Sequence, residues 1–133
     1  MQLMVSTDIA LRTLIYLGRK NEPATIQEVA TAFEISKTHL MKVVMMLVGA
    51  GLLVSERGRN GGIRLAKDAR DISVGAVVRV MENNLALIAC MKDGSLPESC
   101  PLLPRCRLKA VFQGALGAFL ASLDQSTLAD LID

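Results

Sequence analysis

The chain of 133 residues is 51% hydrophobic, which is enough for one domain with a buried core. Its 3% aromatic content, without Trp, argues against a stacking platform for single-stranded nucleic acid. The net charge of +2 is unevenly distributed, because residues 1–80 carry 11 Lys and Arg against 7 Asp and Glu (+4), whereas residues 81–133 carry 4 against 6 (−2). The densest basic run, from Arg57 to Arg70, contains only Asp68 as a counter-charge and is a modest indication of a phosphate-backbone partner.

Three helices are predicted in the first 50 residues. Apolar residues at helical spacing predict the first over 7–18, and a capping box of Thr25 and Glu28 begins a second that ends at Phe33. Ser36 can cap a third helix, which ends at two closely spaced glycines. Two helices joined by so tight a turn match a helix-turn-helix, whose second helix enters the major groove of DNA. On this segment alone, an ordinary helical hairpin is the alternative.

The start of the third helix carries the candidate base-contacting side chains. These are Ser36, Lys37, Thr38, His39 and Lys42. His39 is the only histidine of the chain, so metal ligation is an alternative role for it. We favour DNA contact, because we expect His39 on the exposed face beside Lys37 and Lys42.

A β-hairpin wing is predicted directly after the third helix. Residues 52–56 and 63–66 suit strands, and the RGRNGG segment at 57–62 suits a glycine-rich turn that lets the backbone approach a phosphate. A solvent-exposed hairpin without a partner is the alternative, but basic residues directly after a helix-turn-helix favour a DNA-binding wing. The wing residues expected to contact DNA are Arg57, Arg59, Asn60 and Arg64.

The rest of the chain predicts a sensor loop and a dimerisation helix. A fourth helix begins at Asp71 or Ser73, and Pro104 suits the first turn of a fifth. The fifth helix is apolar on more than one face, so it needs both its own domain and a second subunit, which predicts a C2 homodimer. The expected fold is therefore mainly α with a small β-hairpin wing: a winged helix-turn-helix domain over 1–80, a cysteine loop over 81–107, and a dimerisation helix with a C-terminal helix over 104–133.

Three cysteines lie in that loop, with nine residues between Cys90 and Cys100 and five between Cys100 and Cys106. The N-terminal segment has no basic n-region, long apolar core or cleavage site, and the apolar runs are too short to cross a membrane. We therefore expect a cytoplasmic protein without a membrane partner. In that compartment clustered cysteines bind metal or perform redox chemistry, and one loop can bring three thiolates to one ion or cluster.

Several segments together resemble a known family. ISKTHLMKVV at 35–44, AGLLVSERGRNGGIRLA at 50–66, the three-cysteine loop and CRLKAVFQGALGAFLASLDQSTLADLI at 106–132 closely resemble the iron–sulfur winged-helix regulators. This family includes IscR and nitric-oxide-sensitive repressors, and the resemblance spans nearly the whole chain. It implies a repressor, not an enzyme, which binds double-stranded operator DNA and releases it when nitric oxide nitrosylates or removes the cluster.

The resemblance also implies the ligands. Cys90, Cys100 and Cys106 would hold an iron–sulfur cluster, 4Fe-4S in preference to 2Fe-2S, and the STD motif places a fourth ligand from the second subunit at Asp8. Without the resemblance, Asp8 would be an ordinary acid at a helix N-terminus. The position at which IscR has a ligating histidine is Lys109, which favours the nitric-oxide-sensitive branch.

Three alternatives stay open. The first is an iron–sulfur regulator that senses cluster status or oxidants, and the second is a cluster-free thiol-redox regulator in which Cys100 and Cys106 form a disulfide. Zinc instead of iron at the cysteines is the third. An enzyme with a nucleophilic cysteine is disfavoured, because the only histidine, His39, is expected on the recognition helix.

Overall fold

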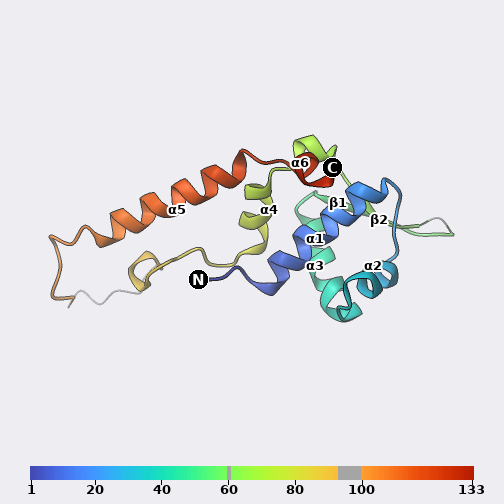
Figure 1. Cartoon of the computed structure of the whole chain (residues 1–133). Coiled ribbons are helices and arrows are strands. Elements are labelled where there is room, and N and C mark those ends of the chain that lie inside the picture. Colours follow the sequence, from blue (N-terminus) through green and yellow to red (C-terminus); the bar gives the residue numbers. More distant parts are fainter. Residues whose placement is uncertain (60, 93–99) are drawn as a thin grey trace.

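The computed structural model describes residues 1–59, 61–92 and 100–133 and confirms the mainly helical fold with one β-hairpin (Figure 1). Asn60 and part of the cysteine loop, residues 93–99, lie outside the described residues. The described elements are α1 (Val5–Lys20), α2 (Ile26–Phe33), α3 (Lys37–Gly49), β1 (Leu53–Glu56), β2 (Gly62–Leu65), the 3-10 turn η1 (Ala69–Asp71), α4 (Val74–Met81), the 3-10 turn η2 (Ala89–Met91), α5 (Leu108–Asp124) and α6 (Leu128–Ile132).

Helix α1 is the centre of the core. It contacts α3, α4, α6 and β2, and its Leu14 and Leu17 belong to one buried apolar cluster with Leu40 and Leu47 of α3. The C-terminal α6 returns to the same core, in which Leu128 is almost completely buried. The hairpin and α5 extend from opposite sides of this core (Figure 1). None of the helices in the described part of the chain has both the length and the apolar character needed to cross a bilayer.

Hydroxyl side chains begin three of the helices, as the sequence predicts. The Oγ1 of Thr25 accepts the Glu28 N–H at 3.0 Å, the Oγ of Ser36 accepts the His39 N–H at 3.1 Å, and the Oγ of Ser73 accepts the Ala76 N–H at 3.0 Å. Each bond satisfies one of the amide groups that a helix N-terminus leaves without a partner. The start of the fourth helix is therefore Ser73, not Asp71.

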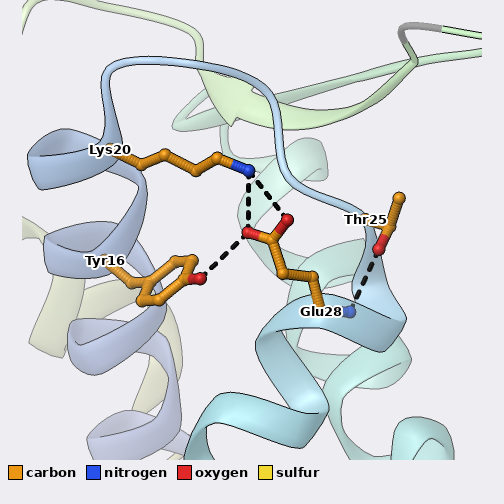
Figure 2. Close-up of polar contacts among 4 residues, drawn as sticks. All are labelled: Tyr16, Lys20, Thr25 and Glu28. Atoms are coloured by element: carbon orange, nitrogen blue, oxygen red, sulfur yellow. Dashed lines mark hydrogen bonds and ion pairs between the residues drawn. The ribbon is translucent and has the colours of Figure 1, made fainter.

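The predicted capping box of α2 is only half formed. The side chain of Glu28 turns away from Thr25 and accepts hydrogen bonds from Tyr16 Oη at 2.9 Å and Lys20 Nζ at 2.7 and 2.8 Å (Figure 2). The hydrogen bond from Lys20, followed by that from Tyr16, lowers the pKa of Glu28 below its ordinary value. The carboxylate thus ties α2, the first helix of the helix-turn-helix, to α1.

The start of the fifth helix was predicted wrongly. Pro104 lies in a run of turns, in which the Leu103 N–H donates to the Cys100 carbonyl at 3.1 Å, and α5 begins at Leu108. The apolar repeat of the helix also begins at Leu108, after polar and charged residues, so periodicity locates this helix start better than the proline does. The other boundaries differ from the predicted ones by one or two residues, within the usual uncertainty of helix and strand ends.

An ion pair fastens the C-terminal end of α5 to α4. Asp124 accepts hydrogen bonds from the guanidinium of Arg79 at 2.6 and 2.8 Å. The pair closes over Gly75, where an added Cβ would collide with the Asp124 carboxylate. Gly75 is thus needed for the close approach of these two helices.

The remainder of α5 is left largely exposed by the described part of the chain, which buries none of its residues. Phe112, Leu116 and Leu120 recur at helical spacing and are half-buried, and α5 contacts α4 and η2. A second apolar stripe is exposed, with Leu108 at 48%, Val111 at 63% and Phe119 at 37%. The predicted excess of apolar surface is therefore present, and the second subunit that would cover it stays a prediction.

Replacing Glu28 by Gln should make the stability of the protein less dependent on pH. Because the pKa of Glu28 is lowered in the folded chain, its contribution is fully present above the unfolded pKa and is lost as the pH falls through the folded pKa. Glu28→Gln should lower the melting temperature by a few degrees at pH 7, and the difference from the wild-type protein should shrink between about pH 5 and about pH 3.

Thermal denaturation followed by circular dichroism at several pH values measures this difference. Asp68 and Asp124 also have lowered pKa values but are present in both proteins, so their contributions cancel. A difference that stays constant down to pH 3 would show that the Glu28 charge does not stabilise the contact with α1.

Candidate nucleic-acid interface and cysteine site

The second and third helices form the predicted helix-turn-helix. At the end of α2, Glu34 adopts a left-handed conformation with φ of 54°, and the Ile35 N–H then donates to the Ala30 carbonyl at 3.0 Å. Ser36 follows as the cap of α3. These contacts reverse the chain within three residues, so α3 packs on α2 through one face and presents the opposite face to solvent.

Three of the predicted base-contacting residues lie on the exposed side of α3. Lys37, Thr38 and Lys42 are all exposed, as a role in the major groove requires. The hydroxyl of Ser36 is also exposed, although it already accepts the His39 N–H as the helix cap. Contact of these residues with DNA stays a prediction.

His39 is half-buried, so the expected position on the exposed face is wrong. Its Nε2 lies 3.3 Å from the Oγ of Ser6, within hydrogen-bonding distance, and thus connects the recognition helix to the first turn of α1. The reason is geometric: α1 crosses α3 in the core, and position 39 falls at the edge of the buried stripe that contains Leu40 and Val43.

The first turn of α1 is also bound to the end of α4. The Oε1 of Glu82, directly after α4, accepts the Met4 N–H at 2.7 Å and the Thr7 hydroxyl at 2.8 Å. Thr7 is completely buried, so its hydroxyl depends on this carboxylate for a hydrogen-bond partner. Sequence patterns gave no sign of Glu82 or Ser6, because each pairs with a residue more than 30 positions away.

The hairpin confirms the predicted wing. β1 and β2 are antiparallel, with Val54 opposite Arg64 and Glu56 opposite Gly62, and the turn between them is supported by the left-handed Gly58. Arg57 and Arg59 are exposed at its tip. Their position allows both guanidinium groups to reach a phosphate backbone, which stays a prediction.

Two of the basic side chains in the run from Arg57 to Arg70 are paired with carboxylates, so fewer of its positive charges are available to DNA than the sequence suggests. Arg64 Nε forms an ion pair with Glu56 Oε1 at 2.8 Å, and Arg70 binds the carboxylate of Asp68 at 3.0 and 3.1 Å. The side-chain hydrogen bond from Arg70 is the main cause that lowers the pKa of Asp68 to about 2. Sequence counting recognised Asp68 as a counter-charge but missed Glu56, which lies just outside the run and reaches Arg64 only across the strands.

The three cysteines lie in the segment that leads from α4 to α5. Cys90 belongs to η2, which contacts α5; Cys100 precedes the run of turns, and Cys106 lies two residues before α5. All three are free thiols and half-buried. Within residues 1–59, 61–92 and 100–133, however, no three His, Cys, Asp or Glu side chains are grouped closely enough to hold a metal ion. The described part of one chain thus does not bring the predicted ligands together.

Asp8 is exposed in the first turn of α1. Its carboxylate binds the guanidinium of Arg12 through two contacts of 3.0 and 3.1 Å, the usual i, i+4 pairing on a helix surface. In chemical terms, three unpaired thiols and an accessible carboxylate are a donor set that suits an iron–sulfur cluster, since thiolates are its usual ligands.

Comparison with known proteins decides the family. The Rrf2 family, described as an iron-dependent transcriptional regulator, matches residues 3–133. The chain belongs to the Rrf2 family. The resemblance to iron–sulfur winged-helix regulators is thereby confirmed.

Curated Rrf2 relatives are similar over the whole chain. The HTH-type transcriptional regulator NsrR of Geobacillus kaustophilus is 47% identical, over 100% of this chain and 90% of the relative. NsrR of Oceanobacillus iheyensis is 46% identical and that of Bacillus subtilis 42%, each over 99% of this chain and 90% of the relative.

Solved Rrf2-like structures share the fold. CymR, the global cysteine regulator of B. subtilis, superposes with a TM-score of 0.77 at 25% identity, covering 99% of this chain and 96% of that chain. IscR of T. potens has a TM-score of 0.77 at 26% identity, covering 99% and 86%. Together with the helix-turn-helix and the wing, the relatives support a DNA-binding transcriptional regulator, and they are regulators rather than enzymes.

Replacing Arg59 by Ala should weaken DNA binding to all sequences alike. If its guanidinium contacts a phosphate, the slope of log affinity against log salt concentration should fall by about one unit. Fluorescence anisotropy with labelled duplexes over a salt series measures both effects. Arg70→Ala is the matched control, because Asp68 already binds that guanidinium, and it should leave the slope unchanged. Equal losses in the two variants would contradict a specific role of the wing.

Proposed function

We propose that this Rrf2 protein is a cytoplasmic, homodimeric repressor that senses nitric oxide through an iron–sulfur cluster and releases its operator when the cluster reacts or is lost. The observation that carries the proposal is the combination, in one chain, of a winged helix-turn-helix with three free thiols beside an unburied helix. Identity of 47% to a regulator named NsrR supports the same assignment.

Cys90, Cys100 and Cys106 would hold the cluster, 4Fe-4S in preference to 2Fe-2S. When bound, it supplies iron that reacts with nitric oxide. The resemblance to the family implies Asp8 of the second subunit as the fourth ligand, and the exposure of its carboxylate is compatible with that role. An oxygen donor would hold its iron less firmly than a thiolate does, which makes that position the reactive one.

The second subunit would cover α5. Its exposed stripe of Leu108, Val111 and Phe119 is apolar. Burial of such a stripe between two copies of a chain is a common basis of symmetric dimers. A dimer would also present two recognition helices to successive half-sites of an operator, through Ser36, Lys37, Thr38 and Lys42 of each chain. Arg57, Arg59, Asn60 and Arg64 of each wing would bind beside them.

The first turn of α1 would transmit the signal. It carries Asp8, and it also contacts the recognition helix through Ser6 and His39 and the end of α4 through Glu82. Release of Asp8 would free it to pair with Arg12, as it does in the isolated chain, and so change the constraints on this turn. Because the turn touches α3 directly, its displacement would alter the position of the helix that reads DNA.

Anaerobic reconstitution with iron and sulfide tests the proposal. The protein should gain visible absorbance and bind a duplex selected from a random library, and nitric oxide should weaken that binding by at least about fivefold. Absence of a chromophore, or binding that nitric oxide leaves unchanged, would contradict it.

Variants test the assignment of the ligands. Replacing any of the three cysteines by Ala should abolish the chromophore and the response to nitric oxide, while circular dichroism shows a folded protein. Asp8→Asn should keep the fold but lose the cluster faster on desalting, whereas Asp71→Asn, a matched exposed acid on η1, should behave as the wild-type protein does. Unfolding of the cysteine variants would instead indicate that the thiols are structural.

A thiol-redox regulator is the second candidate. It is supported by the position of Cys100 and Cys106 at the two ends of one run of turns, where oxidation would join them in a disulfide. If iron-free protein still changes its DNA affinity on treatment with peroxide, this candidate replaces the cluster sensor. Elemental analysis for iron and zinc distinguishes the cluster sensor and the thiol-redox regulator from a protein that binds zinc at the cysteines.

A further inference from the structure

We propose that Met41 and Met45 are specificity-determining residues that contact thymine methyl groups in the major groove of the operator. This inference rests on the proposed binding of α3 to DNA and adds which feature of the bases the helix recognises.

The two methionines lie on the outward stripe of α3. The inward side consists of Leu40, Val43, Val44 and Leu47, all buried. Residues three, four and seven positions apart lie on the same side of a helix, so the stripe opposite the core consists of Thr38, Met41, Lys42 and Met45. Its apolar members are 46% exposed at Met41 and 72% exposed at Met45.

The exposure of these side chains has no explanation in the fold. Met45 is the most exposed large apolar residue of α3, so burial in the core does not account for it. Large apolar side chains gathered on one exposed face mark a contact surface. The two methionines give the exposed stripe of α3 an apolar part next to its polar residues. This part of the recognition helix can therefore make apolar contacts with bases instead of hydrogen bonds.

The positive charge around the stripe indicates that the partner bound there is DNA. Lys37 and Lys42 are exposed beside the methionines, and no acidic residue lies within α3. Such a surface suits a polyanion, and it would repel the same positive surface of a second copy. Within the major groove, thymine alone presents a methyl group, which gives an apolar side chain its specific target. The unbranched, polarisable thioether of Met adapts readily to such a contact.

Substitution of deoxyuridine for thymidine tests the proposal, because it removes only the methyl group. The reconstituted regulator first selects a duplex from a random library, and each thymidine of one half-site is then replaced in turn. Burial of one methyl corresponds to about a fourfold change in affinity, so the wild-type protein should bind about fourfold less tightly at each contacted position. Met41→Ala and Met45→Ala should each bind thymidine and deoxyuridine equally well at one such position.

Met46→Ala is the matched control, since this residue is 39% exposed on the same helix but lies about 100° around it from Met45 and about 140° from Met41. It should retain the full preference for thymidine, and thermal melts establish that all three variants fold. Equal binding of every deoxyuridine duplex by the wild-type protein would overturn the inference while leaving DNA binding intact. Failure to enrich any sequence would overturn both. Dissociation of the protein by Met45→Ala in sedimentation, without a change in thymine preference, would instead make the stripe a contact between copies.

Discussion

The exposed apolar stripe of α5 is the constraint on which the functional assignment depends. The described part of one chain leaves Leu108, Val111 and Phe119 exposed to water, and at the far end of α5 an ion pair between Arg79 and Asp124 attaches the helix to α4. Exposure of this stripe is unfavourable, and pairing with a second copy removes it. The proposed dimer then accounts for two further features, because it would bring a second Asp8 toward the cysteines and place two recognition helices on one DNA duplex.

Helix α1 connects the two ends of the molecule. Its body packs against α3, α4, α6 and β2, and its first turn is held by Glu82 on one side and by His39 on the other. Glu28 fixes α2 to the opposite end of the same helix (Figure 2). In a regulator, the site that detects the signal must be coupled to the element that binds DNA. The first turn of α1 is placed for such coupling, because it carries Asp8, the proposed cluster ligand, and also contacts the recognition helix α3.

Local signals in the sequence predicted most of the fold. Ser36 and Ser73 begin their helices as expected, and Gly58 has the positive φ expected of a glycine in the turn of the wing, because caps and turns depend on a few neighbouring residues. The failures involve pairs distant in sequence. The half-buried position of His39, the pairing of Arg64 with Glu56 and the contacts of Glu82 depend on how elements pack, which no local pattern encodes. Met41 and Met45 were not among the predicted base contacts, because only polar and charged side chains were considered for that role.

Native mass spectrometry of the anaerobically reconstituted protein tests most directly whether α5 pairs two chains around cysteine-bound clusters. The predicted spectrum is that of a dimer in which each chain carries the added mass of one 4Fe-4S cluster, and acidic substitutions at Val111 and Phe119 should shift it to monomers. A monomer that retains a complete cluster, or a dimer that contains zinc and no iron, would contradict the proposed architecture.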